Sequence, residues 1–199
     1  DEAQENKFRL VFEKMNLKPG DKHLDVGCGW GSMVRYAARQ GVKSLGVTLS
    51  KEQAEWAQAK IKEEGLEDLA EVRFMDYRDV TETGFDGISS IGLLEHIGVK
   101  NYASYFEFLA GKLRPGGVMV NHCITYPDNH KTPQGDFINR YIFPDGELTG
   151  SGTIIHEMQD HGFEVFHEEN IRFDYMRTLH DWCENLKACL LYTSDAADE

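Results

Sequence analysis

The stretch that decides the fold is Asp25-Val26-Gly27-Cys28-Gly29-Trp30-Gly31. It follows residues 23–26, which predict a short buried strand, and it precedes residues 32–40, which predict a helix. Glycines at such a turn let the backbone approach a ligand, and dinucleotide-binding folds use the pattern G-x-G-x-x-G there. Here the third glycine comes one residue early and an acid precedes the first. The stretch therefore predicts a ligand-binding loop, with a tight structural turn as the alternative.

Strands and helices alternate along the chain on both sides of this loop. Further strands are expected at residues 44–48, 70–75, 85–91, 118–124 and 163–166. Helices are expected at residues 1–17, 32–40, 50–64, 102–113, 151–161 and 178–187. This alternation predicts an α/β fold with a doubly wound, mostly parallel sheet, and right-handed crossovers place helices on both faces.

The sequence indicates a single domain over residues 1–188. Residues 125–150 interrupt the alternation with a long polar stretch, which we expect to be an insertion over the active site. The chain begins at Asp1 without a methionine, and no strands follow Trp182 to complete the sheet. We therefore expect the domain to be truncated at both ends.

The end of the chain has an unusual sequence. Residues 189–199, from Cys189 to Glu199, resemble the translated read-through of a sequencing-library adapter. We expect this tail not to be natural protein, and an ordinary disordered acidic terminus is the alternative.

Composition excludes several classes of protein. The net charge of −13 over 199 residues argues against a nucleic-acid binder, which needs a basic surface. No stretch approaches the ~20 apolar residues of a membrane-spanning helix. The four cysteines lack the spacing of a zinc site, so we expect no metal, and reduced thiols in a cytoplasmic protein.

Polar residues stand where the second and third strands end. Thr48-Leu49-Ser50 occupies the place where a dinucleotide-binding fold has a ribose-binding acid, about 20 residues after its loop. Ser50 and Gln53 also form a capping-box pattern at the start of the next helix. Asp76-Tyr77-Arg78 follows the third strand and is either a ligand contact or a solvated turn.

Two titratable side chains follow the fourth and fifth strands. Glu95 lies in Glu95-His96-Ile97-Gly98, and His122 lies in Asn121-His122-Cys123-Ile124. Ligands of open α/β sheets bind outside the carboxyl ends of the strands, so we expect both side chains to converge on one small polar ligand. Two separate, satisfied structural residues are the alternative.

Together these motifs resemble the cyclopropane-fatty-acid synthase family of class I S-adenosylmethionine-dependent methyltransferases. The glycine loop has the acid-G-x-G-x-G form of class I methyltransferases. The family pattern G-x-T-L-S-x-x-Q is matched by residues 46–53, and F-I-x-x-Y-I-F-P-x-G-x-L by residues 137–148. Its R-x-H-Y-x-x-T-L block is matched by residues 172–179, where Asp174 replaces the usual histidine. The resemblance covers residues 2–188.

The resemblance implies a Rossmann-like fold, S-adenosylmethionine as methyl donor and a bound bicarbonate as base. The residues it places on the cofactor are Asp25, Gly27, Gly29, Gly31, Thr48, Ser50, Gln53, Asp76 and Tyr77. The methionine end of the cofactor is a zwitterion, so Asp25 is expected to help anchor its ammonium group. The residues it places on bicarbonate are Glu95, His122, Ile124 and Tyr175, and of these Glu95, His122 and Tyr175 are expected to be catalytic.

The reaction implied by the resemblance takes place on an unsaturated phospholipid acyl chain. Its cis double bond attacks the sulfonium methyl group, and proton loss from the added methyl closes a cyclopropane; relatives stop at a methyl branch. The expected location is the cytoplasm, with peripheral contact with the membrane. Four aromatic residues are either core or lining of an acyl tunnel: Phe137, Tyr141, Phe143 and Tyr175.

Three other functions fit parts of the sequence. A small-molecule amine or carbon methyltransferase of the same superfamily would need no carbonate-type base. A nucleotide-dependent oxidoreductase is disfavoured by the early third glycine and the missing ribose acid. A non-catalytic binding domain would not explain Glu95, His122 and Tyr175 together.

Overall fold

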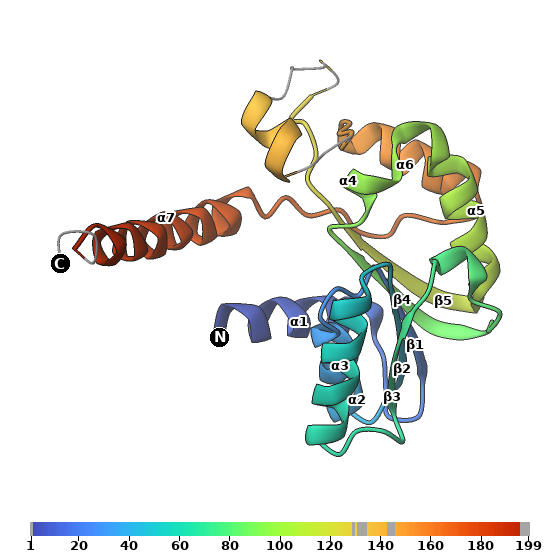
Figure 1. Ribbon diagram of the computed structural model, residues 1–199. Helices are drawn as coiled ribbons and strands as arrows, with labels where there is room; N and C mark the ends of the chain where they lie inside the picture. The colour runs from blue at the N-terminus through green and yellow to red at the C-terminus, as the bar shows by residue number, and fades with distance from the viewer. Residues whose placement is uncertain (1, 129, 131–134, 143–145, 196–199) are drawn as a thin grey trace. The chain divides into compact units, whose positions relative to one another are not determined.

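The computed structural model describes residues 2–128, 130, 135–142 and 146–195. The chain forms two compact units, Asp1–Glu164 and Val165–Glu199, and the first contains the sheet (Figure 1). None of the described helices is long and apolar enough to cross a membrane.

The first unit is built on a parallel sheet whose strands, within the described residues, run in the order β3-β2-β1-β4-β5. Their bounds are β1 (Lys22–Val26), β2 (Lys43–Thr48), β3 (Ala70–Phe74), β4 (Phe85–Ile91) and β5 (Leu113–His122). β1 is central and pairs with both β2 and β4, so the strand order changes direction there. This confirms the doubly wound parallel sheet and creates a switch point, where ligands of such sheets bind.

Helices cover both faces of the sheet (Figure 1). One face carries α1 (Glu2–Met15), α2 (Ser32–Arg39) and α3 (Lys51–Glu63), and the other carries α5 (Tyr102–Lys112) and α6 (Ser151–Asp160). Successive side chains of a strand point to opposite faces. Leu24 and Val26 accordingly join the core under α5 and α6, which leaves His23 and Asp25 for the α1 face.

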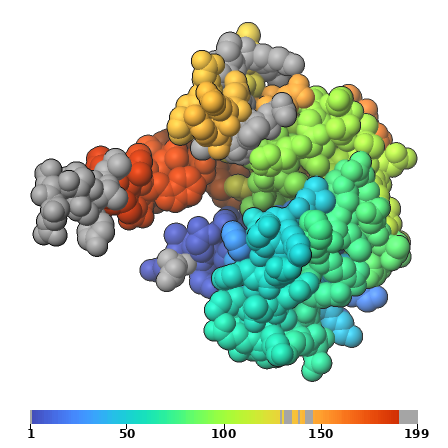
Figure 2. All heavy atoms as spheres, viewed as in Figure 1, coloured from blue at the N-terminus to red at the C-terminus, as the bar shows by residue number. Residues whose placement is uncertain are grey.

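The core under α5 is unusually aromatic. Tyr102, Tyr105, Phe106 and Leu109 are buried at helical spacing, and the Tyr105 hydroxyl donates to Ser90 Oγ at 2.8 Å. Smaller residues of α2 and α3 pack against β3, and the atoms of α3, in cyan, lie at the surface in the space-filling view (Figure 2). The large side chains of α5 on one face of the sheet and the small side chains of α2 and α3 on the other together hold the carboxyl ends of the strands in place.

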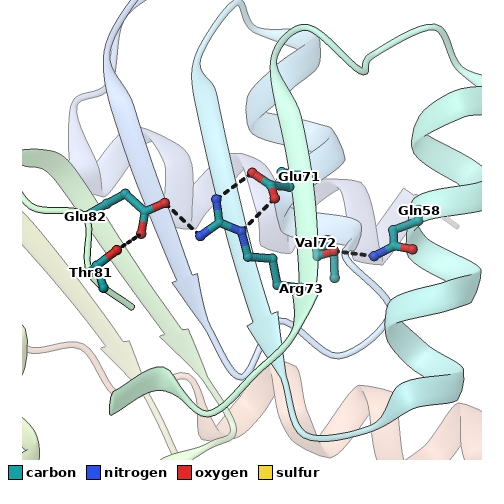
Figure 3. Close-up of polar contacts among 6 residues, drawn as sticks. All are labelled: Gln58, Glu71, Val72, Arg73, Thr81 and Glu82. Carbon is teal, nitrogen blue, oxygen red and sulfur yellow. Dashed lines mark hydrogen bonds and ion pairs between the residues drawn. The ribbon is translucent and has the colours of Figure 1, made fainter. Parts of the chain in front are cut away.

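Within the described residues, β3 is an edge strand that pairs only with β2, and it is tied down by polar contacts (Figure 3). Gln58 of α3 donates to the Val72 carbonyl at 2.8 Å. Arg73 donates to both oxygens of Glu71 and, at 2.7 Å, to Glu82, which precedes β4 (Figure 3). Charged side chains on an edge strand also disfavour pairing with another chain.

Short helical turns lie between the longer elements. They are η1 (Tyr77–Asp79), α4 (Leu94–Ile97), η2 (Val99–Asn101) and the π-helical turn η3 (Ile138–Ile142). α4 and η2 follow β4 directly, so they lie at the carboxyl edge of the sheet. The sequence pattern did not predict α4, because four residues are too few to show helical periodicity.

The part of the chain from Phe163 onward differs most from the sequence-based expectations. The strand predicted at residues 163–166 is wrong, because these residues lie in irregular backbone. Phe163 packs on the aromatic core whereas Phe166 is 80% exposed. Of the two phenylalanines, one therefore anchors the segment to the core, and neither is part of a β-strand. The last helix, expected at residues 178–187, is α7 (Arg172–Asp195) and therefore longer at both ends. The predicted extent of the domain, residues 1–188, stays a prediction.

Candidate active site

The glycine loop joins β1 to α2 and is fastened to β2. Gly27, Gly29 and Gly31 have positive φ angles of 72°, 53° and 68°, a region that side chains rarely adopt. The amides of Gly27 and Cys28 both donate to the Val47 carbonyl at 3.0 Å. The loop is thus held rigidly at the switch point of the sheet.

The three glycines of the loop have different surroundings. A Cβ added to Gly31 would lie 2.9 Å from Ala57 Cβ, and one added to Gly27 would lie 3.0 Å from Leu93 Cδ1. A Cβ added to Gly29 would meet no atom within 4 Å. Gly27 and Gly31 are therefore required by packing, whereas Gly29 faces open space that a ligand can fill.

Asp25 is the second-last residue of β1 and lies directly before this loop. It is 3% exposed and accepts a hydrogen bond from Ser89 Oγ at 2.5 Å. Burial raises the pKa of its carboxyl from 3.8 to about 6, against the opposing effects of Ser89 and of the Lys7 ammonium. A cationic ligand group beside the carboxylate would relieve this cost of burying a charge.

Thr48, Ser50 and Gln53 form a local network at the end of β2. The Thr48 hydroxyl donates to Gln53 Oε1 at 2.9 Å and accepts from the Ser50 amide at 3.2 Å. Ser50 Oγ accepts from the Gln53 amide at 3.2 Å, which confirms the helix cap. The network begins at Thr48, directly after Val47, which accepts the hydrogen bonds of the glycine loop. The predicted contact of these three residues with the cofactor is therefore compatible with their role in the helix cap.

Asp76 and Tyr77 are used structurally in the described contacts. Asp76 caps η1, and its hydrogen bonds with the Arg78 side chain lower the pKa of its carboxyl. Tyr77 is half-buried, with its ring 5.3 Å from that of Tyr105 and 5.5 Å from that of Phe108. Their predicted role beside the adenine stays a prediction.

Glu95 is a buried carboxylate with one oxygen left unpaired. It lies in α4, is 2% exposed, and its Oε1 accepts from the Ile124 amide at 2.7 Å. No hydrogen-bond donor among the described residues reaches the buried Oε2. The Ile124 amide, expected to face a bicarbonate, thus orients Glu95 in the structure.

His122 ends β5 beside the segment that carries Glu95. It is opposite Ile91 in the ladder, and its carbonyl accepts from the Gly92 amide at 2.9 Å. Burial lowers the pKa of its imidazole, an effect that the charge of Glu95 opposes, and the buried Nδ1 has no partner in the described part of the chain. Glu95 is thus bonded to the main chain two residues beyond His122, and each side chain has a buried polar atom of the kind that a small ligand satisfies. Their convergence on one ligand stays a prediction.

Tyr175, the third predicted catalytic residue, belongs to the second unit. It lies on α7, is 40% exposed, and its ring is 6.3 Å from that of Trp182. Its convergence with Glu95 and His122 stays a prediction. Among the predicted tunnel residues, Phe137 and Tyr141 are more than half exposed and form a ring pair at 5.3 Å, and Phe143 lies outside the described residues.

The sequence did not single out Glu147, which is hydrogen-bonded to the main chain of Glu95, or the buried Tyr102. The Glu147 amide donates to the Glu95 carbonyl at 3.1 Å, and Glu147 Oε2 accepts from the Val99 amide at 2.9 Å. Tyr102 is fully buried, and burial raises the pKa of its hydroxyl to about 12. Glu147 occupies a variable position of its motif, so only its contacts could identify it.

Glu147 belongs to the stretch predicted to be an insertion. The two ends of that stretch meet, since Tyr126 and Gly150 form a parallel bridge and the Tyr126 amide donates to the Thr149 carbonyl at 2.9 Å. Through Glu147 the stretch is fastened to the turn that carries Glu95. No group of His, Cys, Asp or Glu in the described ranges is placed to hold a metal ion.

Comparisons with known proteins agree with this geometry. The family profile described as mycolic acid cyclopropane synthetase matches residues 1–198. A probable fatty acid methyltransferase from Mycobacterium tuberculosis is 65% identical over 187 residues, which are 94% of this chain and 44% of that protein. The cyclopropane-fatty-acyl-phospholipid synthase of Escherichia coli is 39% identical over 189 residues, 94% of this chain and 47% of that protein. The chain thus spans about half the length of these curated relatives or less.

Solved structures give the same result. The cyclopropane synthase MmaA2 from Mycobacterium tuberculosis superposes with a TM-score of 0.85 at 31% identity, covering 93% of this chain and 69% of that one. The mycolic acid cyclopropane synthase CmaA1, in complex with SAH and CTAB, gives a TM-score of 0.84 at 32% identity, covering 94% and 70%. The fold of this chain therefore matches that of cyclopropane synthases, one of which was solved in complex with SAH and CTAB.

Proposed function

Because this chain belongs to the mycolic acid cyclopropane synthetase family, we propose that the whole protein is an S-adenosylmethionine-dependent lipid methyltransferase. Its substrate is the cis double bond of an unsaturated fatty acyl chain in a phospholipid, and its product carries a cyclopropane or a methyl branch. The phospholipid is supported by the 39% identical Escherichia coli synthase, whose name specifies that substrate.

The observation that carries this proposal is the pair of unpaired buried atoms, Glu95 Oε2 and His122 Nδ1. Buried polar atoms without partners are rare in native proteins and are explained by a ligand or water that satisfies them. A methyltransferase that acts on an amine needs no added base, whereas closing a cyclopropane requires removal of a proton. A small anion such as bicarbonate at Glu95 and His122 fits that requirement.

The residues on the cofactor side have separate tasks. Gly29 leaves open space for the cofactor, Gly27 and Gly31 hold the loop closed, and Asp25 binds the ammonium group. A second group extends this site toward the ribose and adenine: Thr48, Ser50, Gln53, Asp76 and Tyr77. When bound, S-adenosylmethionine supplies an electrophilic methyl group, and bicarbonate supplies a proton acceptor.

The residues on the substrate side hold that proton acceptor. The Ile124 amide fixes Glu95 through its Oε1 atom. The other oxygen, Oε2, is then available to accept a hydrogen bond from the bound anion. His122 is neutral at physiological pH because burial lowers its pKa, so its ring offers one donor and one acceptor. By its place in the family motif of residues 172–179, the Tyr175 hydroxyl is the third group proposed to hold the anion. Glu95 is buried, so bulk water does not reach its carboxylate. This matters because water would trap a carbocation.

Full-length protein tests the proposal directly. Vesicles of an unsaturated phospholipid are incubated with methyl-labelled S-adenosylmethionine, and the released acyl chains are measured by mass spectrometry. We expect labelled chains, and the ring and the methyl branch are distinguished because they differ by two hydrogens. The reaction takes place in the cytoplasm at the membrane surface, where such chains are found. Label in small amines with none in lipid would refute this function.

A further inference from the structure

Four buried polar side chains form a polar row across three neighbouring strands of the sheet. The row consists of Ser44 from β2, His23 and Asp25 from β1, and Ser89 from β4. The strand register sets these residues side by side, because Ser44 lies opposite His23 and Ser89 lies opposite Asp25. Of the four, the proposed function uses Asp25 alone.

Hydrogen bonds join the polar row into one chain. His23 Nδ1 lies 2.7 Å from Ser44 Oγ, and His23 Nε2 lies 2.9 Å from Ser89 Oγ. Ser89 Oγ in turn lies 2.5 Å from Asp25 Oδ1. His23 and Ser89 are fully buried, and Ser44 and Asp25 are 4% and 3% exposed. Water is therefore excluded from the chain, and its polar groups must satisfy one another.

The direction of this chain follows from counting its protons. An ionised Asp25 can only accept, so Ser89 donates its single hydroxyl proton to Oδ1 and must accept from His23 Nε2–H. Burial lowers the pKa of His23 to about 3, so its ring is neutral and Nδ1 accepts from the Ser44 hydroxyl. Every donor therefore points toward Asp25, and the chain ends on its carboxylate.

Apolar packing surrounds the polar row. Gly87 lies opposite His23 on β4, and a Cβ added to it would lie 3.0 Å from Leu17 Cδ2 and 3.2 Å from Met15 Sδ. Apolar side chains of matching shape would be about as stable here as a hydrogen-bonded row. Stability therefore does not explain the row, whereas its effect on Asp25 does. Burial raises the pKa of that carboxyl, and the Ser89 hydrogen bond opposes this effect.

One oxygen of Asp25 is left for a ligand. The polar row occupies Oδ1, and no hydrogen bond from the described residues reaches Oδ2. Asp25 lies two residues before Gly27, at the start of the loop in which the Cβ position of Gly29 faces open space. The row thus fixes the carboxylate through one oxygen and leaves the other at the ligand-binding loop.

We infer that Ser89, His23 and Ser44 are positioning residues, which hold Asp25 charged and in one orientation for the ammonium group of S-adenosylmethionine. This inference rests on the proposed function and states how Asp25 is prepared for that cofactor. Ser89 acts directly by donating to Asp25. His23 acts through Ser89, because its Nε2–H leaves the Ser89 proton no other acceptor. Ser44 acts through His23, because it fixes which ring nitrogen carries the proton.

Two adenosyl ligands test this inference on the full-length protein by calorimetry. S-adenosylhomocysteine carries the ammonium group, and 5′-methylthioadenosine lacks the whole amino-acid end. We expect Ser89→Ala to weaken the first about tenfold, the order of one hydrogen bond to a charged group, and to leave the second unchanged. Ser90→Ala is the matched control and should weaken neither ligand. It removes a buried hydroxyl of the same strand that bonds to Tyr105 instead.

Variants of His23 test whether the effect runs along the chain. His23→Gln keeps a donor and an acceptor and should keep most of the affinity for S-adenosylhomocysteine. His23→Leu removes both and should weaken that ligand about threefold, within the range of one neutral hydrogen bond. Added to Ser89→Ala, the same change should weaken it no further, because no hydroxyl is left for His23 to direct.

Three results would overturn the inference. Equal weakening of both ligands by Ser89→Ala would show a role in folding alone, and an unchanged affinity would remove the polar row from the cofactor site. Losses that add up in the double variant would show that His23 does not act through Ser89. If Ser89→Ala does not fold, Ser89→Cys keeps a weak donor of similar size and should show the same selectivity. A wild type that binds neither ligand would instead overturn the proposed function, and this inference with it.

Discussion

The two halves of the carboxyl edge of the sheet are built in opposite ways. After β1, glycines form the turn and its amides are paired with the main chain of β2; after β2, the polar side chains Thr48, Ser50 and Gln53 bond to one another. After β4 and β5, the edge carries the buried Glu95 and the half-buried His122, and a buried polar atom of each has no partner among the described residues. The first half has the character of a preformed cradle, and the second has that of a reactive site whose polar atoms await a ligand.

We therefore expect substitutions after β1 and β2 to change ligand binding, and substitutions after β4 and β5 to change the chemical step. In the cradle, shape decides, because backbone and ligand share the same space. In the reactive site, charge decides, because Glu95 and His122 are fixed by the fold whether or not a ligand is present.

Glu95→Gln tests the reactive half. The substitution keeps the shape and removes the charge that holds the proton acceptor, so turnover should fall by ~10²–10⁴-fold, the usual value of a general base. Affinity for S-adenosylhomocysteine, measured by calorimetry, should stay within about twofold on the argument that the effect is confined to the transition state. Glu107→Gln, at an exposed position of α5, is the control. Full activity in Glu95→Gln would remove this residue from the catalytic site.

Gly29→Val tests the cradle. The added side chain would fill the open space in front of the loop, so affinity for S-adenosylhomocysteine should fall by at least about 100-fold while NAD binds to neither form. Backbone strain is controlled by Gly65→Val, since Gly65 also has a positive φ of 66° and open space around its Cβ position. If both variants lost the ligand equally, strain and not occupied space would be the cause.

The pH dependence of stability tests the buried Asp25. Its folded pKa of about 6 exceeds the ordinary value of 3.8, so the folded state binds the proton more tightly than the unfolded state. The unfolding free energy of the wild type should therefore fall by ~3 kcal/mol between about pH 4 and pH 6, and stay flat above that range. Urea unfolding of wild type and Asp25→Asn at each pH measures the difference. A constant difference between the two proteins over this range would show that Asp25 titrates normally.

Glu147→Gln tests how the insertion supports the reactive half. The variant keeps the main-chain bond to the Glu95 carbonyl and weakens the bond to the Val99 amide, so Glu95 should lose some of its alignment. We expect kcat to fall by about tenfold, the cost of weakening one charge-assisted hydrogen bond, with little change in KM for the cofactor. Glu157→Gln on α6 is the comparison. An increase in KM without a change in kcat would contradict this supporting role.

Several features of the molecule could be read from the sequence because they depend on neighbours along the chain. The glycine loop, the cap formed by Ser50 and Gln53, and the sequence of β1 to β5 follow from turn chemistry and from periodicity. The placement of Glu95 and His122 at one edge also followed, because parallel strands present their carboxyl ends together. The strand expected at residues 163–166 was wrong because a local apolar pattern does not show whether a neighbouring strand is there to pair with it.

The fold class, the glycine loop and the family could all be inferred from the sequence, because local patterns and motifs carry that information. Only the tertiary structure decided which glycine faces open space, that the Ile124 amide orients Glu95, and that Glu147 fastens the turn beside it. The physical reason is that hydrogen bonding and burial of a polar atom depend on groups distant in sequence, whose positions are fixed only when the sheet and its helices have packed.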